Sequence, residues 1–136
     1  MKRLVAAIGV VAAVALSVAA VAVASPTNFN GLWNSIDVGD GSHQLLFVAG
    51  GSTKLVVYYD ASAHACLGYS NPAFISTGTA VLGSDGTTMA ATLTGRCVAN
   101  PGVILFGGPF TMNFTTNADG TISDDASGAA FWNRGP

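Results

Sequence analysis

From residue 31 onward, the chain consists of short runs rich in Val, Ile, Thr, Phe and Tyr, separated by Gly, Asp, Asn and Pro. β-Branched and aromatic residues favour strands, whereas the separating residues favour turns. No stretch of this region shows the sustained 3.6-residue periodicity of an amphipathic helix. The pattern therefore predicts an all-β domain and limits the fold to a barrel or a sandwich.

The turns between the predicted strands are short, and short turns make consecutive strands pair antiparallel. Alternation is clearest where Phe110, Met112 and Phe114 are expected to face the core. We expect an antiparallel meander of about eight strands that closes into a small up-and-down barrel, with a two-sheet β-sandwich as the alternative. The predicted strands are 31–38, 43–49, 53–60, 73–82, 87–98, 110–116, 121–123 and 129–134, with a further strand-like segment at 103–106.

The first 24 residues form a segment of a different kind. Lys2 and Arg3 make a short basic start, residues 4–24 carry no charge, and the run ends in small residues at Ala24. This order is typical of a secretory signal peptide, with cleavage expected after Ala24. An uncleaved membrane anchor is the alternative, because about 20 apolar residues can span a bilayer. We expect one β-domain at 25–136 in a secreted or extracytoplasmic location, with membrane contact only if the leader is retained.

Charged residues are scarce in this chain. They make up 9% of its 136 residues, whereas about a quarter of the residues in soluble domains are charged. After the leader, Lys54, Arg96 and Arg134 are the only strong bases, against seven aspartates and no glutamate. Three scattered bases cannot form the basic surface that binds nucleic acid or an anionic membrane. We therefore expect no nucleic-acid partner.

Cys66 and Cys97 are the only cysteines. In the oxidising environment outside the cytoplasm, such a pair is expected to form a disulfide. If the segments 73–82 and 87–98 form a hairpin, both cysteines fall at the end opposite its turn. The bond would then clamp the 61–72 loop to the neighbouring strand.

His43 and His64 are the only histidines, and each is a candidate general base. His64 with Cys66 would make a nucleophilic pair, and both cysteines with both histidines would make a metal site. However, the spacings match no zinc finger or ribbon, and the sequence has no G-x-S-x-G elbow. A disulfide would also leave no free thiol. We therefore expect no metal, no cofactor and no enzymatic activity.

Aspartates recur at the predicted turns. Asp40, Asp85 and Asp119 each begin an Asp-Gly-Ser or Asp-Gly-Thr tripeptide, which suits a tight turn. Calcium binding is the alternative, although the acids lack the dense alternation of a calcium loop. Asp124 and Asp125 are adjacent, so their side chains would point in opposite directions on a strand. We expect these two residues to lie in a solvated loop.

Aromatic residues gather around the 61–72 loop. Tyr58, Tyr59, Tyr69 and Phe74 combine apolar rings with a few hydroxyl groups, and ligand pockets are mostly apolar with a few polar groups. These four residues are the candidate ligand-binding residues. The alternative is that they fill the core.

The two ends of the domain resemble a known family. Gly31-Leu32-Trp33 lies in the first predicted strand and Trp132-Asn133-Arg134 in the last. This pattern resembles calycins, the small β-barrels of lipocalins, avidins and some bacterial protease inhibitors. The resemblance implies that Trp33 plugs the closed end of the barrel and that Arg134 lies across its ring as a cation–π pair. The Tyr-Tyr-Asp strand ending at Asp60, with Cys66 after it, also resembles small uncharacterised exported bacterial β-domains.

The predicted function is binding rather than catalysis. We expect an exported, non-catalytic β-barrel module that binds an unknown small ligand at its open mouth. The alternative is a secreted inhibitor or protein-interaction domain that presents the 61–72 loop to an exported protein. A largely apolar cavity in the barrel would favour the first interpretation, and a protruding, rigid loop near Cys66 would favour the second.

Overall fold

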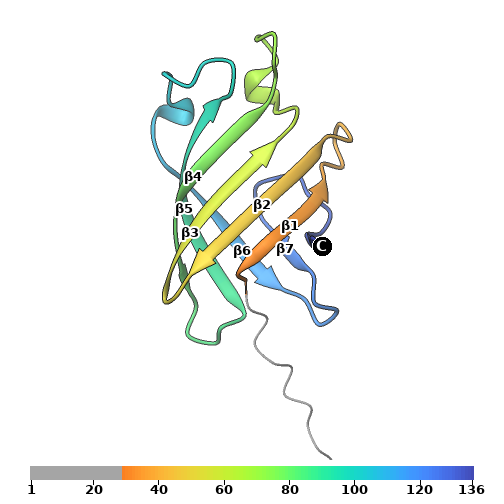
Figure 1. The fold of residues 1–136 in the computed structure, drawn as a ribbon, viewed down its shortest axis with the longest axis vertical. Helices are drawn as coiled ribbons and strands as arrows, with labels where there is room; N and C mark the ends of the chain where they lie inside the picture. The colour runs from red at the N-terminus through yellow and green to blue at the C-terminus, as the bar shows by residue number, and fades with distance from the viewer. Residues whose placement is uncertain (1–28) are drawn as a thin grey trace, which may run out of the picture.

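The computed structural model describes residues 29–136, which form an all-β domain (Figure 1). The predicted signal peptide at 1–24 lies outside the described residues. In the described part, two short 3-10 helices, η1 and η2, are the only helical elements, and neither has the length or apolar character to cross a membrane. The elements are β1 (Gly31–Ile36), β2 (His43–Gly50), β3 (Thr53–Asp60), η1 (His64–Cys66), β4 (Phe74–Leu82), β5 (Thr88–Cys97), η2 (Leu105–Gly107), β6 (Phe110–Thr116), β7 (Ile122–Asp124) and β8 (Asn133–Arg134).

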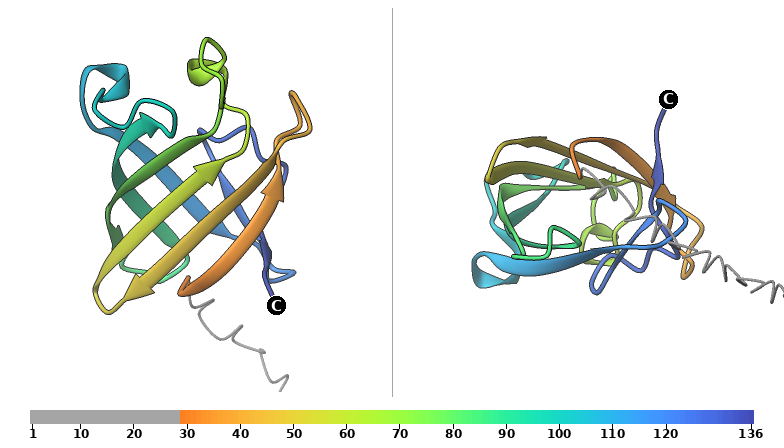
Figure 2. Two further views of the ribbon diagram at one scale, coloured as in Figure 1. Left: turned by 45° about the horizontal axis from the view of Figure 1, so that its top comes forward. Right: turned by 90° about the horizontal axis from the view of Figure 1, so that it is seen from below.

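The eight strands form one antiparallel sheet that is nearly closed into a barrel. Their order is β7-β6-β5-β4-β3-β2-β1-β8, so the predicted meander is confirmed. The two edges of this sheet, β7 and β8, approach each other where Ile122 of β7 and Trp132, directly before β8, exchange two backbone hydrogen bonds of 3.0 and 2.7 Å. Seen from below, the strands surround a common interior, which is the arrangement of a barrel rather than of a sandwich (Figure 2).

The prediction of a strand-like segment at 103–106 is wrong. Leu105–Gly107 forms η2, and Phe106 has left-handed backbone angles of φ 60 and ψ 14. Proline has no N–H to donate to a ladder, and Pro101 and Pro109 flank this segment. The final strand, predicted at 129–134, is also shorter than expected, because only Asn133–Arg134 forms β8. Both differences leave loops at the rim of the barrel.

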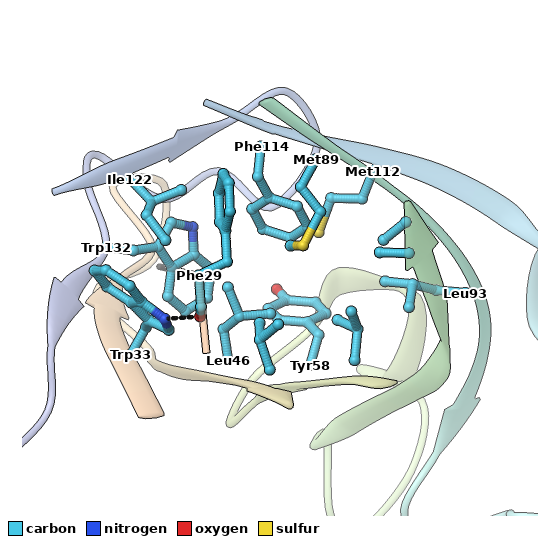
Figure 3. Close-up of a cluster of buried hydrophobic side chains, with 14 of the residues drawn as sticks. Phe29, Trp33, Leu46, Tyr58, Met89, Leu93, Met112, Phe114, Ile122 and Trp132 are labelled. Atoms are coloured by element: carbon cyan, nitrogen blue, oxygen red, sulfur yellow. Dashed lines mark hydrogen bonds between the residues drawn. The ribbon is translucent and has the colours of Figure 1, made fainter. Parts of the chain in front are cut away.

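The interior is filled by one alternating set of side chains from each long strand (Figure 3). The predicted inward residues of β6 are confirmed, since Met112 and Phe114 are fully buried. On β3 the inward set is the one that includes Val56 and Tyr58. The same set begins with Lys54, whose Nζ donates 2.8 Å hydrogen bonds to the Asn30 side chain and the Gly50 carbonyl. The interior therefore has a polar group near one end as well as an apolar middle.

One end of the barrel is closed by Trp33. Its ring is fully buried, and Nε1 donates a hydrogen bond of 2.8 Å to the carbonyl of Phe29. The guanidinium carbon of Arg134 lies 4.4 Å from the centroid of the Trp33 ring, and Nη1 donates to the carbonyl of Asn30 at 2.9 Å. Gly31 makes room for this contact, because a Cβ there would lie 2.9 Å from Arg134 Nη1. Trp33 and Arg134 thus fill the interior at this end of the barrel.

The predicted disulfide is confirmed. Cys66 in η1 and Cys97 at the end of β5 are joined with an S–S distance of 2.02 Å, and both are buried. The loop that carries η1 is tied a second time, because Asn100 Nδ2 donates a hydrogen bond to the Tyr69 hydroxyl. The disulfide thus holds two rim loops together at the open end.

The turn aspartates behave as the turn prediction requires. Each accepts a backbone hydrogen bond from the residue two positions later, at 2.8 Å for Asp40 and 3.0 Å for Asp85 and Asp119. Hydrogen bonds from the following Ser42, Thr87 and Thr121 lower the pKa of these three carboxyl groups. These aspartates therefore stabilise hairpin turns.

Removing the disulfide is expected to destabilise the barrel strongly. The bond closes a segment with a sequence separation of 31 residues, so the double variant Cys66→Ala, Cys97→Ala should lose about 3 to 4 kcal/mol of unfolding free energy. Equilibrium urea unfolding followed by circular dichroism measures this loss. The reduced wild-type protein is the control and should match the double variant. Equal unfolding midpoints for the oxidised wild type and the double variant would contradict the prediction.

Candidate functional site

A cavity of about 460 Å³ opens at the end of the barrel opposite Trp33. This volume lies in the range of small-molecule sites in proteins. The ends of β3, β4 and β6, the two 3-10 helices and the turn after β7 contribute its walls. Its lining residues are Asp37, Tyr58, Asp60, Ala63, His64, Ala65, Phe74, Phe106, Phe110, Met112, Ala126 and Ser127.

One wall of the cavity is aromatic. The rings of Phe74, Phe106 and Phe110 contact one another, with centroids 5.5 to 6.4 Å apart. Gly95 on β5 is required for this wall, since a Cβ there would lie 2.5 Å from two atoms of the Phe74 ring. The backbone of Phe106 places its ring at the mouth, where the side chain is 65% exposed. This wall offers an apolar surface to a bound molecule.

The opposite part of the cavity is polar and is organised by Gln44. This side chain is fully buried, and its Nε2 lies 2.7 Å from the carbonyl of Ser127 and 3.1 Å from the hydroxyl of Tyr58. The same nitrogen is 3.4 Å from Oδ2 of Asp37 and 3.4 Å from Oδ2 of Asp60. Gln44 therefore gathers three cavity-lining side chains around one amide group.

Tyr58 lies at the junction of the apolar and polar parts. Its ring has edge contacts with Phe74 and Trp132, each with centroids 5.9 Å apart. Its hydroxyl donates a 3.3 Å hydrogen bond to Oδ2 of Asp60. Burial, followed by the negative charge of Asp60, raises the pKa of the Tyr58 phenol. The hydroxyl therefore stays protonated at neutral pH and acts as a hydrogen-bond donor.

Asp60 and Asp37 are held differently. Asp60 is almost fully buried, and its Oδ1 accepts hydrogen bonds of 2.9 Å from the Ser42 hydroxyl and from the Ser62 N–H. Asp37 is half-buried and accepts a 2.6 Å hydrogen bond from the Gly39 N–H on Oδ1. Within residues 29–136, Oδ2 of each residue has only the long contact to Gln44 and, for Asp60, the contact to Tyr58.

Asp124 was expected to lie in a solvated loop, and this prediction is wrong. It is half-buried at the end of β7, and Oδ1 accepts hydrogen bonds from the N–H groups of Ala126 and Ser127. Its Oδ2 accepts a 2.7 Å hydrogen bond from Nε1 of Trp132. Asp124 therefore positions the turn that lines the cavity. The carboxylate of Asp125 accepts hydrogen bonds from the backbone N–H and the side-chain amide of Asn113 on β6.

The structure separates the four candidate ligand residues. Tyr58 and Phe74 line the cavity. Tyr59 belongs to the outward set of β3 and is half-buried there. Tyr69 is 39% exposed on the 61–72 loop, outside the cavity lining.

Sequence reasoning missed several residues of the cavity. Gln44 and Asp60 continue the inward alternation of Leu46 on β2 and Tyr58 on β3. Their inward orientation could therefore have been predicted if the inward face of each strand had been known. Phe106 was missed because its segment was predicted to be a strand.

The histidines do not form a catalytic arrangement in the described residues. His64 is exposed at the rim of the cavity, and His43 is exposed on β2, outside the cavity lining. Neither imidazole is within hydrogen-bond distance of a serine hydroxyl or a carboxylate in residues 29–136. In the same part of the chain, no three His, Cys, Asp or Glu side chains converge as a metal site would require.

Comparison with protein-family models, with curated proteins and with solved structures finds no significant match for this chain. The cavity and its chemistry are therefore the basis for a functional proposal.

Replacing Gln44 tests the network beneath the cavity. Gln44→Leu removes the donor to the Ser127 carbonyl and to the Tyr58 hydroxyl, so the unfolding free energy should fall by about 1 to 3 kcal/mol. Urea unfolding measures this change. Thr92→Leu, a polar-to-leucine change at an exposed position of β5, is the matched control and should stay within about 0.5 kcal/mol of wild type. A Gln44→Leu protein as stable as wild type would contradict a stabilising network.

Proposed function

We propose that this protein is an exported, non-catalytic binding module that holds a small, largely apolar ligand in the mouth cavity of its barrel. One observation carries the proposal. The cavity of about 460 Å³ combines an aromatic wall with a small set of converging polar groups, and this combination is typical of ligand sites. The polar groups at its base can orient a ligand, whereas the rings can bury its apolar part.

Two features support the exported location and the binding role. A disulfide is compatible with an oxidising compartment outside the cytoplasm, in agreement with the expected leader. The same bond tethers the η1 loop that lines the cavity, and holding a site in its binding conformation lowers the ordering cost of binding. The disulfide thus favours one position of the η1 part of the cavity wall.

The proposal that the protein is non-catalytic rests on the surroundings of His64. A general base needs a partner that orients it and a nucleophile within hydrogen-bond reach. His64 is exposed and has neither within the described residues. The polar groups of the cavity are instead engaged with one another through Gln44.

Filling the cavity tests the proposed function. The neutral dye Prodan should bind the oxidised protein with a blue-shifted emission that saturates at one dye per chain. Ala126→Phe adds a ring at an exposed position of the lining and should weaken Prodan binding about tenfold, or about 1.4 kcal/mol.

The control for this experiment is Ala118→Phe, because Ala118 is also exposed but lies in the turn between β6 and β7 at the other end. It should leave Prodan binding unchanged. Absence of saturable binding by the wild type, or equal effects of the two variants, would contradict a ligand site in the cavity.

A second candidate function is a protein-interaction or inhibitory domain that presents the 61–72 loop. The observation that favours it is the exposure of Leu67, which is 56% exposed, on a loop fixed by the disulfide. Leu67→Ala would then weaken binding of an exported protein partner and leave Prodan binding intact. Partner binding that is unaffected by Leu67→Ala would exclude this role for the loop.

A further inference from the structure

We propose that the ligand of the mouth cavity is a small organic amine. Its ammonium group is held by Asp37 and Asp60, and its apolar body packs against Phe74, Phe106 and Phe110. The inference rests on the proposed function, because it names the chemical class of the ligand that the cavity binds. Three features of the cavity lead to it.

The first feature is the sign of the charge. Among the residues that the structure describes, two aspartates line the cavity and no lysine or arginine does. The strong bases of the described chain act elsewhere, with Lys54 on Asn30 and Gly50 near the closed end, Arg134 over Trp33, and Arg96 on the carbonyl of Pro101. His64 is the only lining side chain that can carry positive charge, and it lies exposed at the rim. Carboxylates at a partly desolvated site favour a positively charged neighbour.

The second feature is a surplus of hydrogen-bond acceptors. The amide nitrogen of Gln44 carries two hydrogens, but four acceptors lie 2.7 to 3.4 Å from it. The carbonyl of Ser127, at 2.7 Å, takes one hydrogen, so the remaining three acceptors share the other. In addition, Oε1 of Gln44 is buried without a hydrogen-bond partner in the described part of the chain. The Oδ2 atoms of Asp37 and Asp60, two residues that line the cavity, therefore share a single long donor hydrogen, and an ammonium group would supply further donors to them.

The third feature is the proximity of the two carboxylates. Oδ2 of Asp37 and Oδ2 of Asp60 are both 3.4 Å from the same nitrogen of Gln44. Each aspartate also lines the cavity, so one group in the cavity can approach both. A primary ammonium has three N–H donors, and hydrogen bonds between charged groups are about twice as strong as neutral ones. An amine thus matches the geometry better than a single-donor alcohol.

The remainder of the cavity determines the rest of the ligand. Apart from Tyr58, His64 and Ser127, the rest of its lining is phenyl rings, Met112 and alanines, which offer an amine chain or ring an apolar surface. A carboxylate ligand would place a third negative charge beside Asp37 and Asp60 at high cost. We therefore expect discrimination by charge rather than by the shape of the apolar body.

Three ligands that share one phenyl body test the inference: phenethylamine, phenethyl alcohol and hydrocinnamate. Competition against Prodan, confirmed by isothermal titration calorimetry, gives the affinity of each. Phenethylamine should bind about tenfold or more tightly than the alcohol, as expected for hydrogen bonds to charged groups. Hydrocinnamate should bind most weakly.

Asp37→Asn and Asp60→Asn should each remove most of the preference for the amine over the alcohol while Prodan binding persists. Asp37 is half-buried and its Oδ2 has only one long contact, so this variant carries the test if the Asp60 variant fails to fold. Asp119→Asn is the matched control, because it removes the same charge from an exposed turn away from the cavity. This control should keep the preference of the wild type.

The outcomes separate the two proposals. If Prodan and the alcohol bind the wild type and the amine binds no more tightly, the ligand class is wrong and the cavity remains a ligand site. The same conclusion follows if every aspartate variant that folds keeps the amine preference. If neither Prodan nor any of the three ligands binds, the proposed function itself is overturned.

Discussion

Closure of the sheet at Trp132 is the constraint on which the rest of the barrel depends. Trp132 exchanges backbone hydrogen bonds with Ile122 and so joins β7 to the segment before β8. Its indole is fully buried, bonds to Asp124 and packs edge-on against Tyr58. One residue thus connects the barrel seam, the turn that lines the cavity and the ring at the centre of the site.

The two ends of the barrel differ in how well their buried polar groups are matched by hydrogen-bond partners. At one end, Trp33, Phe29 and Lys54 fill the interior, and the ammonium of Lys54 is matched by oxygen acceptors. At the other end, Gln44 and Asp60 are buried among acceptors that outnumber the available donors. Buried polar groups are normally satisfied, so the imbalance at the mouth is the feature that supports the proposal of a binding site there.

Much of the fold could be predicted because its signals are local. The alternation of Phe110, Met112 and Phe114 identified β6 and its inward face correctly, and the turn aspartates mark hairpins as expected. The segment 103–106 failed because its apolar residues lie between prolines and before glycines with positive φ, where backbone geometry overrides side-chain propensity. Asp124 was misplaced because its partner, Trp132, comes from the closing segment of the barrel.

The sequence by itself determined an all-β meander and a disulfide between its only two cysteines, since turns, alternation and cysteine count need no distant information. Tertiary structure decided which face of β3 is internal, because both faces carry apolar side chains, Leu55 and Val57 on one and Val56 and Tyr58 on the other. A period of two shows which residues share a face but not which face is buried. In the closed barrel the Tyr58 face of β3 is internal, and Gln44, Asp37 and Asp60 lie together at the mouth.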